Sequence, residues 1–212
     1  MGMRDRWLHQ FGHPSGLRGR AVGRLLDRMH RRVYGGALEC LDLASHHDVL
    51  EIGFGGGVGL GVLGECLREG TGTLTGIDIS HEMVRHNTKR FASDVQSGKL
   101  HLSIADVADL PFPDDHFDRA VAVNTVYYWP VPAKGLAEVG RVLKPEALFL
   151  IAVGERKNGK SMRLSIPGHT AYSEADLTAL FDEAGYDDIA SCRVPTRPGW
   201  NGLFVYGRNP KR

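Results

Sequence analysis

The chain has 212 residues, of which 42% are hydrophobic and 24% are charged, and this is the balance of one ordinary globular domain. The formal net charge of +1, together with the lack of an apolar run that could span a bilayer, favours neither binding to nucleic acid nor stable membrane insertion. The three cysteines lack the number and spacing of a disulfide framework or a zinc site, so we expect a cytoplasmic protein in which Cys40 and Cys66 are buried thiols.

Residues 1–46 are predicted to be helical, because apolar residues recur at helical spacing in Val22, Leu25, Leu26, Met29 and Val33. The same segment is rich in arginine. In one interpretation it covers the substrate pocket of a main domain over residues 47–212, with Trp7, Phe11 and Tyr34 as lining. In the other, its basic face meets an anionic lipid surface or an acidic substrate. Several glycines and a proline interrupt the segment, which favours the cover.

From residue 47 onward, short apolar or β-branched runs alternate with helical stretches. Strands are predicted at Asp48–Ile52, Thr73–Ile77, Leu100–Ile104, Arg119–Asn124, Leu148–Val153, Ile189–Val194 and Leu203–Tyr206. Helices are predicted at 57–68, from Ser80, at 133–143 and from Ser173, where Asp176 completes a capping box. This alternation predicts an α/β fold with a mostly parallel sheet, whose ligand binds beyond the carboxyl ends of the strands.

A glycine-rich turn follows the first predicted strand, in the stretch VLEIGFGGGVG at residues 49–59. The stretch lacks the Lys-Ser/Thr of a phosphate-binding Walker loop. It also departs from the dinucleotide fingerprint, because Val58 stands where the third glycine is needed. Glu51 at the strand end would repel a pyrophosphate, but it suits a ligand that carries an ammonium and a sulfonium group.

Two acids end the next two predicted strands. Asp78 lies about twenty residues past the turn, where a carboxylate can accept from both ribose hydroxyls. Ile79 and Met83 offer apolar faces to an adenine ring. Asp106 is placed to accept from the adenine amino group, and the Val107 N–H to serve a ring nitrogen. The alternatives are that Asp78 caps a helix and Asp106 belongs to a turn; their joint placement favours function.

These residues resemble the class I S-adenosylmethionine-dependent methyltransferases, in the small-molecule branch called methyltransferase type 11. The matching stretches are VLEIGFGGGVG (49–59), GIDIS (76–80), IADVADLPFPDDHFD (104–118) and EVGRVLKP (138–145). The resemblance implies a Rossmann-like, doubly wound sheet of seven mostly parallel strands with an antiparallel last strand. It implies S-adenosylmethionine as cofactor, S-adenosylhomocysteine as product, and no metal.

In this family the methionine moiety lies over the turn, which here contains Gly53, Phe54, Gly55 and Gly57. The resemblance also implies ribose on Asp78 and adenine near Asp106. One departure is visible, because the family usually has Pro-Gly-Gly after RVLK, whereas Pro145 is followed by Glu146 and Ala147. This turn precedes the fifth strand, far from the expected cofactor, so the departure concerns the geometry of the loop and not the activity.

Transfer of a methyl group from a sulfonium needs mainly alignment and exclusion of water. The predicted function is therefore methyl transfer to an O, N or C atom of a small molecule that the sequence does not identify. Asn124 is expected to line the cofactor at the end of the fourth strand. Tyr127, Tyr128 and Trp129 either wall an apolar acceptor pocket or pack the following helix.

A general base is required only for a hydroxyl or a protonated amine, and the candidates are His9, His13 and His169. No cluster with metal-ligand spacing occurs in the sequence. Two rival functions remain. One is a regulatory protein or subunit that binds S-adenosylmethionine without turnover, and the other is a nicotinamide oxidoreductase, which Val58 disfavours. We expect a monomer or a homodimer.

Overall fold

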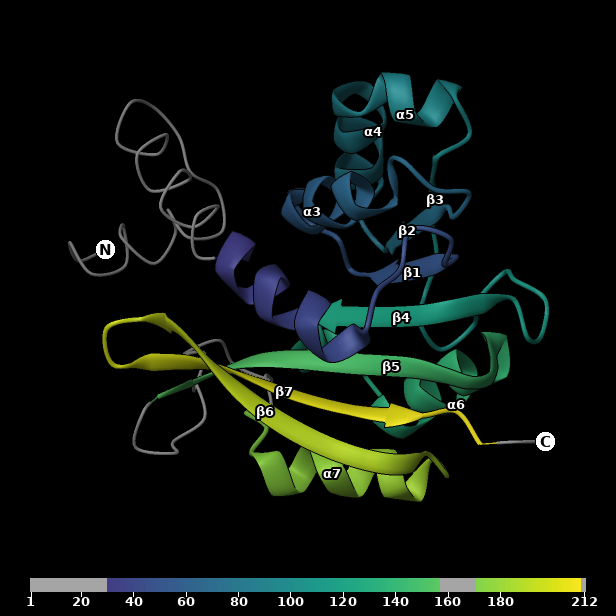
Figure 1. Cartoon of the computed structure of the whole chain (residues 1–212). Coiled ribbons are helices and arrows are strands. Elements are labelled where there is room, and N and C mark those ends of the chain that lie inside the picture. The colour runs from purple at the N-terminus through teal and green to yellow at the C-terminus, as the bar shows by residue number, and fades with distance from the viewer. Residues whose placement is uncertain (1–29, 157–170, 211–212) are drawn as a thin grey trace, which may run out of the picture.

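The computed structural model describes residues 30–156 and 171–210 (Figure 1). A helix over residues 30–41 comes first and has no label in the figure. The labelled elements are β1 Val49–Ile52, α3 Val58–Leu67, β2 Leu74–Asp78, α4 His81–Arg90, α5 Ala92–Gln96, β3 Leu100–Ile104, β4 Phe117–Val123, η1 Val126–Tyr128, α6 Pro132–Val142, β5 Leu143–Arg156, α7 Glu174–Glu183, β6 Asp187–Arg197 and β7 Trp200–Arg208. Within the described ranges, no helix is both long enough and apolar enough to cross a membrane.

All seven predicted strands are present, in one sheet with the order β3-β2-β1-β4-β5-β7-β6. The pairs formed by β1 with β2 and β4, by β2 with β3 and by β4 with β5 are parallel. β7 runs antiparallel to both β5 and β6. The predicted sheet with an antiparallel last strand is therefore confirmed. β5 is longer than predicted, and its pairing with β7 runs from Leu148 opposite Arg208 to Arg156 opposite Trp200.

Helices cover both faces of the sheet (Figure 1). Because successive strand residues point to opposite faces, Leu50 and Ile52 pack in the core beneath α6 and α7. Val49 packs in the other core, beneath the helix at 30–41 and α3. The same alternation places Glu51 on the face of Val49, so that the helix at 30–41 lies over a carboxyl group at the end of β1.

The helix at 30–41 lies along β6 in a regular register. Arg32 donates from Nη1 to the carbonyl oxygen of Thr196 over 3.2 Å. At Gly36, an added Cβ would come within 2.8 Å of Cγ2 of Val194. Four helical residues rise about 6 Å, and two strand residues rise about 6.6 Å. Every fourth residue of the helix therefore lies beside every second residue of β6, and the two segments run in opposite directions.

The next step of this register brings Cys40 and Cys192 together. Both are half-buried free thiols, and they lie close enough for Cys192 to act on the ionisation of Cys40. Burial, followed by the neighbouring Cys192, raises the pKa of the Cys40 thiol to about 12. The expectation of a buried thiol is wrong for Cys66, which is exposed on α3. The apolar neighbours of Cys66 in the sequence predict a helix, but they do not show which face of that helix packs against the sheet.

The turn in place of Pro-Gly-Gly has the unusual conformation that its sequence suggests. Glu146 has a φ of 65°, in the left-handed region that favours glycine. Its N–H donates to the carbonyl oxygen of Asn209 over 2.9 Å, and the Asn209 side chain donates to the carbonyl oxygen of Leu143 over 2.7 Å. Asn209 is buried, so its hydrogen bonds hold the turn although an exposed glutamate stands at the left-handed position.

α6 holds the loop that follows β3. Glu138 accepts from the Leu110 N–H over 2.9 Å, and Arg141 donates to the carbonyl oxygens of Leu110 and Phe112 over 3.0 and 2.9 Å. The Arg141 guanidinium lowers the pKa of the Glu138 carboxyl group. The sequence stretches LPFP and EVGR therefore interact, and this interaction fixes the loop that carries Asp106.

Candidate functional site

The carboxyl ends of β1 and β2 meet at the glycine-rich turn. Gly53 continues the pairing of the two strands, since its N–H donates to the carbonyl oxygen of Ile77 over 2.7 Å. The Asp78 carboxylate then accepts from the Gly55 N–H over 2.8 Å and from the Ser80 N–H over 2.9 Å. Asp78 therefore connects the turn to the start of α4. Each carboxylate oxygen has a second lone pair with which it can accept from a ligand hydroxyl.

The glycines of the turn have different requirements. An added Cβ at Gly53 would lie 2.3 Å from Oγ1 of Thr125, and one at Gly57 would lie 2.0 Å from Oδ1 of Asn87. Packing within the chain therefore demands glycine at both positions. Gly55 also has a positive φ of 49°, but a Cβ there would meet no heavy atom within 4 Å. The backbone at Gly55 thus faces open space that a ligand can occupy.

Two side chains of α4 that the sequence analysis missed also hold the turn. Asn87 is fully buried and donates to the carbonyl oxygens of Gly55 and Met83, each over 2.9 Å. Arg90 donates to the carbonyl oxygen of Gly56 over 2.7 Å. A signal was present in the sequence, because Asn87 stands four residues after Met83, on the face of the helix that was predicted to point inward.

Glu51 is completely buried at the end of β1. Its Oε1 accepts from the Tyr34 hydroxyl over 2.5 Å, and its Oε2 has no hydrogen-bond partner among the described residues. Burial is the largest influence and raises the pKa of this carboxyl group to about 8. The Tyr34 hydrogen bond acts in the opposite direction, and the Asp78 charge adds to the rise. Burial without a cationic partner therefore favours the protonated form of this carboxyl group.

The acid after β3 has a different environment. Asp106 is exposed, and its Oδ1 accepts from the Ala108 N–H over 2.9 Å, so it forms part of a turn as the alternative interpretation allowed. Val107 is buried in the core beneath α6. Ile79, expected against the adenine ring, leaves 77% of its surface exposed. A large apolar side chain at this exposure, next to Asp78, is available to a planar ring.

Asn124 occupies the end of β4 in a strained conformation. Its φ is 54°, and its Oδ1 is buried without a hydrogen-bond partner in the described structure. Its N–H donates to the carbonyl oxygen of Ala152 on the neighbouring β5. A non-glycine residue in this region costs about 1–3 kcal/mol and such residues cluster at functional sites. The sequence analysis expected Asn124 at this edge, but not its backbone conformation.

Three of the predicted pocket aromatics are core residues instead. The Tyr127 hydroxyl accepts from the Gly154 N–H over 3.0 Å, and Trp129 packs against Gly135 of α6. Tyr34 is buried against Glu51. These rings are buried and do not line a pocket, because α6 packs against Trp129 and α3 packs against Tyr34. Of the predicted pocket aromatics that the structure describes, only Tyr128 is exposed, at 57%, and it remains a candidate for acceptor contact.

Trp7, Phe11, His9, His13 and His169 lie outside the described residues. Within 30–156 and 171–210, no group of three or more His, Cys, Asp or Glu side chains has an arrangement that could hold a metal ion. Phe54 of the turn is buried, so only its backbone is available to a ligand. Met83 is half-buried and packs against the core beneath α3.

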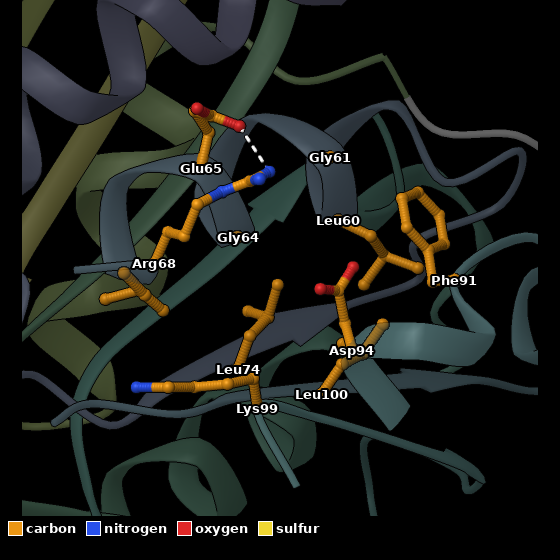
Figure 2. A pocket seen from close by; sticks show the side chains of 11 residues that line it. Leu60, Gly61, Gly64, Glu65, Arg68, Leu74, Phe91, Asp94, Lys99 and Leu100 are labelled. Atoms are coloured by element: carbon orange, nitrogen blue, oxygen red, sulfur yellow. Dashed lines mark hydrogen bonds and ion pairs between the residues drawn. The ribbon is translucent and has the colours of Figure 1, made fainter. Parts of the chain in front are cut away.

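Figure 2 shows a hollow at the opposite edge of the sheet. It lies near the amino ends of β2 and β3, and Leu74, Leu100 and Lys99 form part of its lining. An ion pair of 2.6 Å between Arg68 and Glu65 lies at its border. Its volume of about 90 Å³ is far below the 300–1,000 Å³ typical of small-molecule sites. The hollow therefore does not compete with the turn as a ligand site.

Comparison with known families identifies the region that carries the turn. Residues 50–151 match the family model described as "Methyltransferase domain", of type 11. The chain is 34% identical over 108 residues to 2-methyl-6-phytyl-1,4-hydroquinone methyltransferase 1 of Oryza sativa subsp. japonica. That match covers 51% of this chain and 31% of the relative, so the chain spans about a third of the relative's length.

Two further similarities extend over more of the chain. The uncharacterized methyltransferase YdaC of Bacillus subtilis (strain 168) is 28% identical over 149 residues, which cover 70% of this chain and 76% of the relative. The crystal structure of a SAM-dependent methyltransferase from Aquifex aeolicus superposes with a TM-score of 0.66. It covers 82% of this chain and 88% of its own at 23% identity, which shows a shared fold.

Proposed function

Because residues 50–151 belong to the methyltransferase domain family of type 11, a class I S-adenosylmethionine-dependent group, we propose that this protein transfers a methyl group from S-adenosylmethionine to an O, N or C atom of a small molecule. The observation that carries the proposal is the open space at Gly55, between the acids that end β1 and β2. Gly53 and Gly57 are needed for packing within the chain, whereas Gly55, whose positive φ of 49° also favours glycine, leaves space in which a ligand can approach the backbone.

The residues at this edge fit the chemistry of the cofactor. S-adenosylmethionine is a cationic adenosine derivative, and a site with the Asp78 carboxylate and an ionisable Glu51 favours a cation over a pyrophosphate. In the proposed arrangement the methionine moiety lies over the turn, the ribose hydroxyls donate to Asp78, and Ile79 and Asp106 bind the adenine. The buried, unpartnered Oδ1 of half-buried Asn124 is a further acceptor for a ligand at the end of β4.

When bound, the cofactor supplies an activated methyl group on a sulfonium. The chain then has to orient the two reactants and exclude water, for which a rigid site is sufficient. Asp78, Asn87 and Arg90 fix both sides of the turn before a ligand arrives. The proposal therefore needs no general base unless the acceptor is a hydroxyl or a protonated amine.

The acceptor belongs to a class that the relatives suggest. The Oryza sativa relative is a hydroquinone methyltransferase by name, so apolar ring compounds are the first acceptors to test. Tyr128 and Val131, each 57% exposed, follow the end of β4 in the chain and offer apolar surface to such a ring. A screen of hydroquinones, phenols and amines with methyl-labelled S-adenosylmethionine would identify the acceptor.

Calorimetry separates the proposal from its rivals. We expect binding of S-adenosylmethionine and S-adenosylhomocysteine and no response to NADH. Tight NADH binding without response to the other two would refute the proposal in favour of an oxidoreductase. Binding of S-adenosylmethionine without labelled product from any acceptor in the panel would favour a regulatory subunit without turnover.

We also infer a cytoplasmic location, a monomer or homodimer, and no nucleic-acid partner. Three cysteines without CxxC spacing fit a reducing compartment, and a net charge of +1 offers little attraction to a phosphate backbone. Cell fractionation, sedimentation of the purified protein and a shift assay with RNA test the three statements.

A further inference from the structure

The contact between Glu51 and Tyr34 joins the end of β1 to the helix at 30–41. The carboxyl group is completely buried, and Tyr34 is 5% exposed. A Cβ added at Gly59 would lie 2.0 Å from Oε1 of Glu51 and 2.3 Å from the Tyr34 hydroxyl oxygen. The first turn of α3 therefore packs directly on the pair, and it leaves no space for a third side chain beside this hydrogen bond.

The charges around Glu51 are unusual for a buried acid. The described groups that act on its ionisation are the Tyr34 hydroxyl from the helix at 30–41 and the Asp78 carboxylate from β2. Neither is a cation, and α3 contributes a glycine. A buried acid that lacks a cationic partner favours its neutral form, whereas an added positive charge nearby favours the anion. The site thus lacks one positive charge that a ligand can supply.

We propose that Tyr34 is a positioning residue for Glu51, and that binding of cationic S-adenosylmethionine drives the release of a proton from Glu51. The inference rests on the proposed function. The proton leaves the Glu51 carboxyl group for solvent or buffer, and the resulting anion keeps the Tyr34 O–H as a donor to Oε1. The positive charge of the ligand then balances the anion inside the protein.

Linkage between proton and ligand gives a measurable signature. Between the lower pKa of Glu51 in the complex and its pKa in the free protein, which is about 8, affinity for the cation rises about tenfold per pH unit. Above that value Glu51 is already ionised and no longer contributes to the pH dependence of the affinity. Since the Tyr34 hydrogen bond stabilises the anion, its loss raises the pKa of Glu51 further and moves the upper limit of this pH dependence to higher pH.

The experiment is isothermal titration calorimetry of the whole protein with S-adenosylmethionine, between about pH 6 and about pH 9. Buffers of different ionisation enthalpy report the number of protons released. Wild type is expected to release about one proton per ligand near pH 7 and to show the tenfold slope. Glu51→Gln is expected to bind without proton release and without the slope. Tyr34→Phe is expected to keep the slope but with its upper limit at higher pH.

Tyr186→Phe is the matched control, because Tyr186 is also a buried tyrosine and its hydroxyl donates to the Leu136 carbonyl oxygen in the other core. It loses a buried hydrogen bond while Glu51 is untouched, so its pH profile should match wild type. Infrared difference spectra give a second readout that does not depend on ligand affinity. The wild type without ligand should show a protonated carboxyl band near neutral pH that is missing in Glu51→Gln.

Three results would overturn the inference. One is binding that releases no proton, and the second is a Tyr34→Phe profile identical to those of wild type and Tyr186→Phe. The third is an infrared spectrum in which Glu51 is already ionised near pH 7 without ligand. Each of these leaves the proposed function intact, provided that S-adenosylmethionine binds. Wild type that fails to bind S-adenosylmethionine at every pH would overturn the proposed function and this inference with it.

Discussion

Replacement of Gly55 by alanine tests whether the open space in the turn belongs to a ligand. The added Cβ meets no heavy atom within 4 Å, so the variant should fold. The φ of 49° puts alanine in the left-handed region, at a cost of about 1–2 kcal/mol. Reduced freedom of the unfolded chain offsets about 0.4–1 kcal/mol of this. A net loss of about 1 kcal/mol lowers Tm by about 2–4 °C for a domain of this size.

The effect on affinity should be larger than the effect on stability. A methyl group in space that the ligand fills costs about 1–3 kcal/mol, which weakens binding of S-adenosylmethionine about 5- to 150-fold. Gly98→Ala is the matched control, because Gly98 has a φ of 76° and equally open surroundings, but lies between α5 and β3. Scanning and titration calorimetry should give both variants a similar fall in Tm, and only Gly55→Ala a loss of affinity. Equal affinity of the two variants would refute the assignment of the turn.

Three other changes test separate parts of the structure. Glu146→Gly removes the strain of a side chain in the left-handed conformation at an exposed position, so it should stabilise the chain by about 1 kcal/mol. Glu146→Ala keeps a Cβ at this position and should be near neutral. Urea unfolding followed by circular dichroism distinguishes the two variants. Since folding raises the pKa of Glu51 from an unfolded value of 4.5 to about 8, stability should fall as pH rises through that interval and level off above it. Glu51→Gln should lack this part of the pH dependence in thermal unfolding, and an equal dependence would contradict the neutral carboxyl group. Asp78→Asn leaves one acceptor oxygen for the N–H groups of Gly55 and Ser80, so equilibrium dialysis should show S-adenosylmethionine affinity reduced by about tenfold or more with the fold retained.

Local sequence signals predicted most of the fold, because its elements are regular and end at recognisable residues. The capping box of Ser173 and Asp176 is formed by reciprocal hydrogen bonds at the start of α7. Short or extended elements were missed where such signals are weak. α5 has five residues and no apolar periodicity, and β5 begins at Leu143, where the pattern of α6 had been extended by one residue.

The residues of the candidate site were likewise predictable only where a local sequence signal marks them. Asp78 could be found because it ends a strand, and strand ends in a parallel sheet share one edge. Tyr34 and Glu51 are 17 residues apart, and only packing of the helix at 30–41 on the sheet brings them together. Tyr127 and Trp129 were assigned to a pocket because an aromatic residue near a strand end suits a core and a pocket equally. Burial, which a single sequence does not report, decides between them.

The match between the helix at 30–41 and β6 has an evolutionary consequence. One residue inserted between Arg32 and Cys40 would rotate the following residues by about 100°, and Cys40 would turn away from Cys192. A single deletion would rotate them by the same amount in the other direction. This stretch can therefore diverge by substitution at constant length, whereas changes in length should be confined to the connections on either side. Homologous chains should keep the number of residues between the tyrosine above Glu51 and the thiol position even where few side chains are shared.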